Sequence, residues 1–468
     1  MLKRFGGYGL AFTLLAGCAS PNYQAPAVTL PSAWSAPNGQ AASDISEQWW
    51  KLYQDPQLDQ MVDEALRHNA NLALAVARVD EARAQLGLAR ADEGPNINAS
   101  FDRGRQKTSS VGSFPLPPGV ATERDIYRAQ LNVAYELDLW GRLRHATAAA
   151  RADLLASEAA QDTVRIALAA DVVQGYFALR AFDEQVVATQ RSLGTRSEWL
   201  ILQQLRLKEG VISEFDYRQL EAEVAAVRAQ LPILENERAR QENALAILLG
   251  RSPQIIYAGR IERTAEDSHP SLALYVPAGL PSELLLRRPD LIEAEQRLIA
   301  ANARIGAARA ALFPSLALTG ALGSESTLLR DLFSGPAGIW SLFASVTQPV
   351  FAAGRLNAGI ESAQARERQA LAQYQLTVQT AFREVRDAIH AQQKMQQRFA
   401  AEEQRVSALR QSLRLAQLRY ENGVASQLDV LDAERNLLNA EQGRADALRA
   451  QRAAVADLFK ALGGGWAR

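Results

Sequence analysis

The sequence is poor in the residues that build metal and disulfide sites. Its 468 residues include one cysteine and four histidines, which excludes a structural zinc site and an internal disulfide framework. An excess of one charge is also lacking: 51 basic and 52 acidic residues leave a net charge of -1, which argues against a nucleic-acid-wrapping protein. No stretch reaches the roughly 18 uninterrupted apolar residues of a membrane-spanning helix. Because 48% of the residues are hydrophobic, a folded protein is still expected.

Enzyme signatures are absent as well. The chain has no GxxxxGK[ST] phosphate loop, no HExxH metalloprotease motif and no GxSxG nucleophile elbow. Acidic pairs such as Glu402-Glu403 lie in charge-rich segments that are typical of solvated helix faces. We therefore predict no enzymatic activity, no catalytic residue, no cofactor and no metal.

The first residues have the features of a secretory signal. A basic start precedes an apolar segment over residues 5–16 and the tetrad LAGC at 15–18. This tetrad resembles the lipobox of bacterial lipoproteins, which implies removal of residues 1–17 and acylation of Cys18. Ala19 is not the Asp that often holds such lipoproteins at the inner membrane, so outer-membrane delivery is expected. The alternative is an ordinary signal peptide with an incidental cysteine.

The rest of the chain contains an internal repeat. Residues 205–250 match residues 418–463 without gaps at an offset of 213. Matches further upstream have an offset of 219, so an insertion or deletion lies between residues 95 and 141. These matches indicate a duplicated half. The predicted divisions are a signal peptide (1–17), a lipid-anchored segment (18–56), a first repeat (57–250), a linker (251–287), a second repeat (288–463) and a tail (464–468).

Each half contains two stretches in which apolar and polar residues alternate. Hairpins are expected over 96–139 and 315–352, although Phe343 breaks the alternation of the last stretch. Four strands of about 9–11 residues suit a transmembrane sheet with lipid outside and polar residues inside. Four strands cannot close a barrel, because about eight make the smallest filled one. Several chains would therefore have to share a barrel; two soluble hairpins with one buried face are the alternative.

Helices of unusual length are expected after each hairpin. Residues 141–209 and 354–421 contain no proline, and each helix could approach about 100 Å. Helices this long need a lateral partner. Residues 213–250 supply one with a heptad-like apolar seam, although Pro232 should kink or restart that helix. Shorter helices are predicted over 57–93 and 289–312.

The two turns between these helices repeat one motif. Each has a glycine that suits a helix end, followed by an S-x-x-D sequence that is typical of helix capping. Capping is a sufficient explanation for Asp216 and Asp429. Capping does not explain Asp432, because it lies one turn deeper, beyond the capping positions; an exposed i,i+3 ion pair with Arg435 is the alternative to a functional role.

In combination, these features resemble the TolC-type outer-membrane factor family, especially its lipid-anchored efflux members. The resemblance covers residues 15–463, and its most specific motifs lie at 135–143, 280–291, 305–314 and 420–435. It implies a mixed α+β membrane protein with a periplasmic barrel of long antiparallel helices. It also implies a homotrimer, in which four transmembrane strands per chain make a 12-stranded β-barrel.

The resemblance further implies the outer-membrane exit duct of a tripartite efflux pump, lipid-anchored at Cys18. Small molecules would pass through it passively. The implied partners are a periplasmic adaptor protein and an inner-membrane transporter of the resistance–nodulation–division type. An exit duct for type I protein secretion and a pore-less, lipid-anchored coiled-coil scaffold are the alternatives. The substrate is not encoded in this chain, because selectivity in the family resides largely in the pump.

The family places the second turn at the closed periplasmic tip. Threefold symmetry would convert one carboxylate per chain into a ring of three, and mutual repulsion would raise the pKa values of that ring. A ring of leucines could add an apolar constriction. Ala425 stands where some relatives carry a helix-bridging Arg, which puts that bridge in doubt here. The implied gate residues are Leu428, Asp429, Asp432 and Arg435, and the implied contacts with neighbouring helices are Tyr420 and Asp216.

Overall fold

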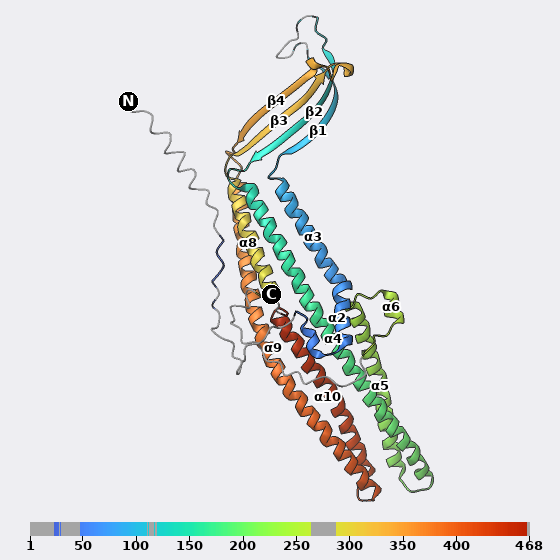
Figure 1. Ribbon diagram of the computed structural model, residues 1–468. Coiled ribbons are helices and arrows are strands. Elements are labelled where there is room, and N and C mark those ends of the chain that lie inside the picture. Colours follow the sequence, from blue (N-terminus) through green and yellow to red (C-terminus); the bar gives the residue numbers. More distant parts are fainter. Residues whose placement is uncertain are drawn as a thin grey trace. The chain divides into compact units, whose positions relative to one another are not determined.

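The computed structural model is shown in Figure 1. The residues it describes are 23–27, 29, 47–109, 111, 117, 119–263 and 287–465. The lipobox with Cys18, most of the segment 18–56 and linker residues 264–286 lie outside this part of the chain. The predictions made for them therefore stay predictions.

The chain divides into two compact units, each of which contains residues from both halves of the repeat. The strand unit contains the described parts of Met1–Ala27, Arg78–Glu158 and Glu293–Gln375. The helix unit contains the described parts of Val28–Ala77, Ala159–Ile292 and Leu376–Arg468. The spatial units therefore cut across the repeat rather than following it.

All four predicted strands form, and they join into one antiparallel sheet in the order β1-β2-β3-β4. The two hairpins are connected through β2 and β3, so the two halves of the repeat share this sheet. Within the described chain, β1 and β4 are the two edges. The strands are β1 (Asn96–Lys107), β2 (Glu123–Leu137), β3 (Ser315–Ser326) and β4 (Gly338–Thr347).

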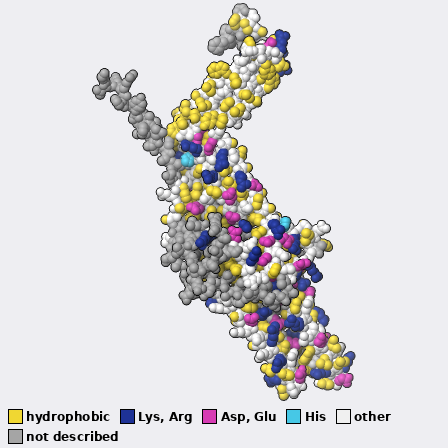
Figure 2. Space-filling view, viewed as in Figure 1, with side chains coloured by type: hydrophobic (Ala, Val, Ile, Leu, Met, Phe, Trp, Pro, Cys, Tyr) yellow, Lys and Arg dark blue, Asp and Glu magenta, His cyan; other side chains and the backbone are white. Residues whose placement is uncertain are grey.

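The register of the sheet collects the apolar positions of all four strands on one face. One row across the sheet is Ala99, Leu131, Leu322 and Trp340. The adjacent row, on the opposite face, is Asn98, Asn132, Ala321 and Ser341. On the apolar face Trp340 is 79% exposed, and hydrophobic atoms cover much of the strand region in Figure 2. A single chain thus leaves one side of its sheet apolar and unburied.

The first predicted helix is in fact two helices. Residues 57–93 were expected to be continuous, but α2 (Pro56–His68) and α3 (Ala70–Ala91) are separated by Asn69. The Asn69 backbone is extended, and its side-chain oxygen accepts hydrogen bonds from the first backbone N–H groups of α3. Its amide nitrogen donates to the carbonyl of Leu248 at 2.9 Å. One residue therefore ends α2, caps α3 and holds both to the end of the first repeat.

The long helices have equal lengths in the two halves. α4 (Arg142–Lys208) and α9 (Arg355–Glu421) each have 67 residues, and α5 (Glu214–Leu248) and α10 (Gln427–Ala461) each have 35. The prediction that Pro232 restarts a helix is wrong, because α5 runs through it as one helix. Buried side chains on α5 pack it laterally, which offsets the loss of one backbone hydrogen bond. None of the helices in the described chain is long and apolar enough to cross a bilayer.

Shorter elements complete the helix unit and the strand unit. α8 (Pro289–Ala310) begins the second repeat, and η2 (Trp49–Tyr53) begins the described helix unit. The Trp49 ring stacks on Phe459 at 4.9 Å in the main hydrophobic core. The predicted linker begins with α6 (Pro253–Ala258).

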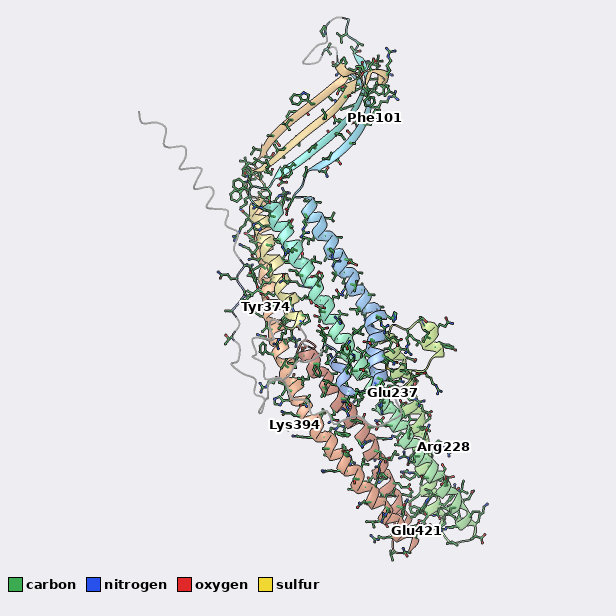
Figure 3. The ribbon with its side chains drawn as sticks, viewed as in Figure 1. Phe101, Arg228, Glu237, Tyr374, Lys394 and Glu421 are labelled. Atoms are coloured by element: carbon green, nitrogen blue, oxygen red, sulfur yellow. The ribbon has the colours of Figure 1, made fainter. Side chains whose placement is uncertain are left out.

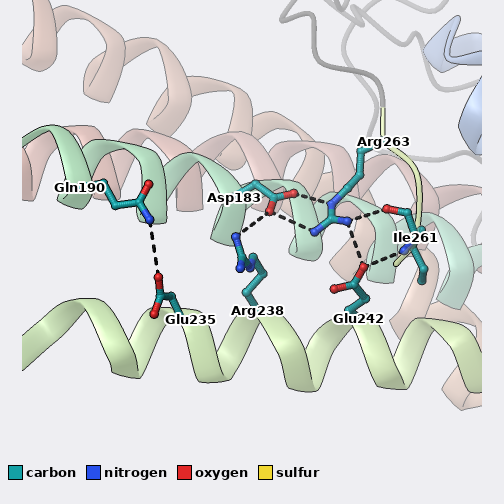
Figure 4. A network of polar contacts seen from close by, with 7 residues as sticks. All are labelled: Asp183, Gln190, Glu235, Arg238, Glu242, Ile261 and Arg263. Carbon is teal, nitrogen blue, oxygen red and sulfur yellow. Dashed lines mark hydrogen bonds and ion pairs between the residues drawn. The ribbon is translucent and has the colours of Figure 1, made fainter. Parts of the chain in front are cut away.

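A polar network attaches the residues after α6 to two helices (Figure 4). Arg263 pairs with Asp183 of α4 at 2.7 Å and with Glu242 of α5 at 3.0 Å. Glu242 also accepts a hydrogen bond from the backbone N–H of Ile261 at 2.7 Å. These contacts fix the start of the linker against the α4–α5 hairpin.

The structure makes a sharp prediction for Gly250, which ends the first repeat. Its φ is +72°, and an added Cβ would lie 2.1 Å from the backbone oxygen of His68. We expect Gly250→Ala to destabilise the protein by about 1–2 kcal/mol through the left-handed backbone and about 1–3 kcal/mol more through the clash. Gly210→Ala is the matched control, because Gly210 has φ +73° but nothing within 4 Å.

Thermal unfolding followed by circular dichroism in detergent measures the difference. Gly250→Ala should lower the midpoint clearly more than Gly210→Ala. Equal midpoints for the two variants would contradict the close backbone approach at the end of the first repeat.

Candidate functional site

The two helical turns of the helix unit have the same backbone geometry. A glycine with φ +73° stands two residues after the end of α4 and of α9, at Gly210 and Gly423. In both turns the residue after the glycine donates its N–H to the carbonyl five positions earlier at 2.9 Å. Glu421, labelled in Figure 3, is the last residue of α9 before the second turn. The sequence repeat is therefore reproduced in the conformation of these turns.

The second turn carries a complete capping box. The Ser426 hydroxyl accepts the backbone N–H of Asp429 at 3.3 Å, and the backbone N–H of Ser426 donates to the Asp429 carboxylate at 2.8 Å. The pKa of Asp429 is lowered mainly by the hydrogen bond from the Ser426 hydroxyl and secondly by the one from the Ser426 backbone N–H. Within one chain, this effect opposes the rise that repulsion in a ring would produce. Asp429 therefore caps α10 whether or not it also lines a gate.

Asp216 in the first turn has a similar but simpler environment. The Ser213 hydroxyl donates to its carboxylate at 2.7 Å and accepts its backbone N–H at 3.1 Å. These bonds tie Asp216 to the start of its own helix. The hydrogen bonds of its carboxylate, within the described chain, thus do not reach the neighbouring helix that the family resemblance implies.

Asp432 and Arg435 form an ion pair on the surface of α10. Arg435 Nη2 donates to Asp432 Oδ1 at 2.6 Å, and both side chains are about half exposed. Arg435 Nη1 also lies 3.9 Å from Glu223 on α5. Leu428, in the first turn of α10, is 50% exposed. The pair thus links α10 to α5, which an isolated i,i+3 pair would not do.

Tyr420 lies against α4. Its hydroxyl accepts hydrogen bonds from Gln203 Nε2 at 3.1 Å and Arg206 Nη1 at 3.0 Å. Its ring lies 5.4 Å from the ring of Trp199. The family resemblance points to Tyr420 but to neither of its polar partners, Gln203 and Arg206. The hydrogen bond from Arg206 to Tyr420 thus connects α4 to α9.

A buried ion cluster lies deeper between the helices, and sequence reasoning missed it. Arg196 of α4 is 1% exposed and pairs with Glu223 of α5 at 2.9 Å and Glu434 of α10 at 3.4 Å. Burial raises the pKa of Glu434, and the nearby Arg196 opposes that rise. The only sequence signal was the match of Glu434 with Glu221 in the repeat. That match does not reveal burial, because Glu221 is 45% exposed.

The chemistry of this region is that of helix-to-helix attachment. No group of three or more His, Cys, Asp or Glu side chains gathers in a metal-binding arrangement anywhere in the described chain. The charged groups instead connect α4, α5, α9 and α10 near two exposed turns. A site of this kind can control whether helices stay together.

A family comparison agrees with the duplicated architecture. The model of the outer membrane efflux protein family matches residues 61–251 and 280–464. The chain belongs to the outer membrane efflux protein family. The two matched segments of this outer membrane efflux protein correspond closely to the two predicted repeats. The family is one of export ducts rather than enzymes, and this chain is an outer-membrane efflux channel.

Individual relatives agree over nearly the whole length of this efflux protein. The antibiotic efflux pump outer membrane protein ArpC of Pseudomonas putida is 36% identical over 474 residues, covering 100% of this chain and 96% of the relative. The cation efflux system protein CusC of Escherichia coli O6:H1 is 35% identical over 457 residues, covering 97% and 96%. The CmeC outer membrane channel of Campylobacter jejuni superimposes with a TM-score of 0.90 at 28% identity, covering 96% and 95%. These similarities favour a channel over the pore-less scaffold. None of the three names refers to protein secretion.

Proposed function

We propose that three copies of this chain join their sheets edge to edge into one 12-stranded β-barrel in the outer membrane. The observation that carries this proposal is the open four-stranded sheet, whose β1 and β4 have no outer partner in the described chain. Unpaired strand edges and an exposed apolar face both favour association in lipid. Three sheets of four strands give a closed barrel with apolar residues outside and polar residues inside.

The long helices form the periplasmic part of the duct. α4 and α9, at 67 residues each, are long enough to reach about 100 Å. Small molecules pass through passively. The partners are a periplasmic adaptor and a proton-driven inner-membrane transporter of the resistance–nodulation–division type. The cargo class stays broad, because the name of one relative refers to antibiotics and that of another to cations.

The second turn forms the resting gate of the duct. The Asp432–Arg435 pair and the exposed Leu428 come from each chain, so a trimer presents three of each around one axis. Asp429 adds a carboxylate whose pKa is lowered by the capping hydrogen bonds from Ser426. Tyr420 holds α9 to α4 beside the gate, whereas Asp216 supports the first turn.

An acyl anchor at Cys18 completes the assembly. The LAGC tetrad and the absence of any other cysteine support this assignment. Acyl chains on three copies would hold the trimer firmly at the inner leaflet of the outer membrane. The domain division that follows is a signal peptide, an anchored segment (18–56) and two repeats (57–250 and 288–463) joined by a linker.

Cross-linking between strand edges tests the shared barrel. Ser100→Cys on β1 combined with Ser341→Cys or Ser345→Cys on β4 places thiols on the polar face of both free edges. A short bifunctional maleimide reagent applied to intact outer membranes should give species with the mass of two and then three chains, and nothing larger. A ladder that ends at three is expected, because a closed ring of three has no free edge left.

The control pair lies on the two central strands. Asn132→Cys and Ala321→Cys are opposite each other within one chain. Their cross-linked product should therefore keep the mass of a single chain. If the control pair reacts but the edge pairs give only species with the mass of one chain, the shared barrel is contradicted. A ladder beyond three chains would contradict the stoichiometry.

A further inference from the structure

Arg196 occupies an unusual position for a cation. It lies on α4 about three helical turns before that helix ends at Lys208, and only 1% of its side chain is exposed. A guanidinium stays charged in proteins, so its burial is costly unless carboxylates and hydrogen bonds compensate. Its Nε and Nη2 make no hydrogen bond to the described residues, which leaves ionic attraction as their main compensation.

The two carboxylates that face Arg196 come from different helices. Glu223 on α5 accepts a hydrogen bond from Nη1 at 2.9 Å, and Glu434 on α10 lies 3.4 Å from Nε. One cation therefore attaches α4 to both helices that begin at the turns. Removing it would leave Glu434, which is 9% exposed, as a buried carboxylate without a cation.

The same cluster extends to the surface pair of the proposed gate. The second oxygen of Glu223 lies 3.9 Å from Arg435 Nη1, and Arg435 pairs with Asp432. The resulting chain of charges runs from Glu434 through Arg196, Glu223 and Arg435 to Asp432. Exposed ion pairs contribute little to stability, whereas breaking a buried one has a large effect. The buried end of the chain is therefore where its rigidity originates.

The duplication shows that this cluster is not a packing feature that both halves share. The position equivalent to Arg196 in the second half is Leu409, 213 residues later. The position equivalent to Glu434 in the first half is Glu221, which is exposed and pairs with Arg218 on its own helix. Only one of the two possible clusters exists, and it is the one that includes the helix of the proposed gate.

We propose that Arg196 is a positioning residue for the gate, which fixes the first turns of α10 against the α4–α5 hairpin. The proposal rests on the proposed gate function of Asp432 and Arg435. Arg196 acts through Glu223 and Glu434, and it does not itself line the opening. Its loss releases the start of α10 while the barrel and the remaining helix contacts stay in place.

Single-channel conductance in planar bilayers tests the proposal. Arg196→Met, which keeps an unbranched apolar stem but removes the charge, should raise conductance several-fold. Glu223→Gln should raise it less, because Arg196 keeps Glu434 as a partner. Glu223→Gln also serves as the second variant should Arg196→Met fail to assemble, because it removes no buried cation.

Arg263→Met is the matched control. Arg263 also pairs with one carboxylate from α4 and one from α5, and it is 18% exposed, but no ion pair connects it to Asp432 or Arg435 in the described chain (Figure 4). A merely structural role for Arg196 would make both variants equally leaky or equally tight. Thermal unfolding midpoints should be measured for the same variants. They distinguish loosening of the gate from a general loss of stability.

The outcomes separate this proposal from the gate itself. A conductance rise in Arg196→Met and Glu223→Gln but not in Arg263→Met supports the positioning role. Unchanged conductance in the first two variants, with a rise in Asp432→Ala/Arg435→Ala, overturns the role of Arg196 and leaves the gate standing. No rise in any of these variants overturns both.

Discussion

Replacing Asp432 and Arg435 together with alanine should raise the open-channel fraction of the purified trimer. The Asp432–Arg435 pair links α10 to α5 through Glu223, so its loss frees the start of α10. An exposed pair contributes about 0.2–1 kcal/mol. Three symmetric copies then contribute about 0.6–3 kcal/mol, and since about 1.4 kcal/mol corresponds to tenfold, the open fraction should rise about threefold to hundredfold. Planar-bilayer recordings measure this fraction directly.

The first repeat supplies a matched control for the gate variant. Arg218 and Glu221 form an exposed i,i+3 pair at 2.8 Å on α5, close to the first turn. Replacing both with alanine removes the same type of contact without touching α10. Conductance near that of the wild type is expected for this control. Equal behaviour of the two double variants would assign the effect to general loosening of the helices, and unchanged conductance in the gate variant would refute the gate.

Leu342→Arg should severely reduce assembly, because Leu342 lies on the apolar face near the middle of β4. It is 73% exposed in one chain and shares its row with Ile97 and Val133. A charged side chain on the lipid face of a barrel costs about 2–4 kcal/mol near the bilayer midplane. The fraction of trimer that survives on unheated gels, and the urea concentration that unfolds it in lipid vesicles, should both fall.

Ser341→Arg is the corresponding control on the opposite face. Ser341 is adjacent in sequence and shares its row with Asn132 and Ala321, so its side chain points into the water-filled interior in the proposed barrel. Trimer yield should therefore stay close to that of the wild type. If Ser341→Arg were the more damaging of the two, the assignment of the lipid-facing side of the sheet would be reversed.

Much of the fold could be predicted from the sequence because its signals are periodic. Alternation identified all four strands, and the absence of proline identified two helices of 67 residues. The repeat at an offset of 213 anticipated the equal lengths of α5 and α10. Each of these signals is local or arises from comparing the chain with itself, so one sequence was sufficient.

Features that depend on tertiary context were missed. Asn69 interrupts a segment rich in helix formers, because its side chain caps α3 and reaches Leu248. Pro232 was expected to kink or restart its helix, yet no restart occurs, because α5 is one helix from Glu214 to Leu248. The pairing of β2 with β3 connects strands about 180 residues apart in the sequence. No local sequence pattern predicts it.

The candidate site was predicted unevenly for the same reason. The S-x-x-D pattern identified the capping residues, because capping is a local interaction, and the capping box at Asp429 is confirmed. The burial of Arg196 could not be predicted, because a single arginine in a charge-rich helix is normally expected to be solvent-exposed. Its burial results from the approach of α5 and α10, which neither spacing nor composition encodes.

Native mass spectrometry of the processed protein, extracted from outer membranes in detergent, is the most direct test of the shared channel. We expect a single species of three chains, each lacking residues 1–17 and carrying acyl groups on Cys18. A species containing one chain, from membranes that otherwise yield intact trimeric porins, would contradict the proposal that this sheet closes only with two further copies.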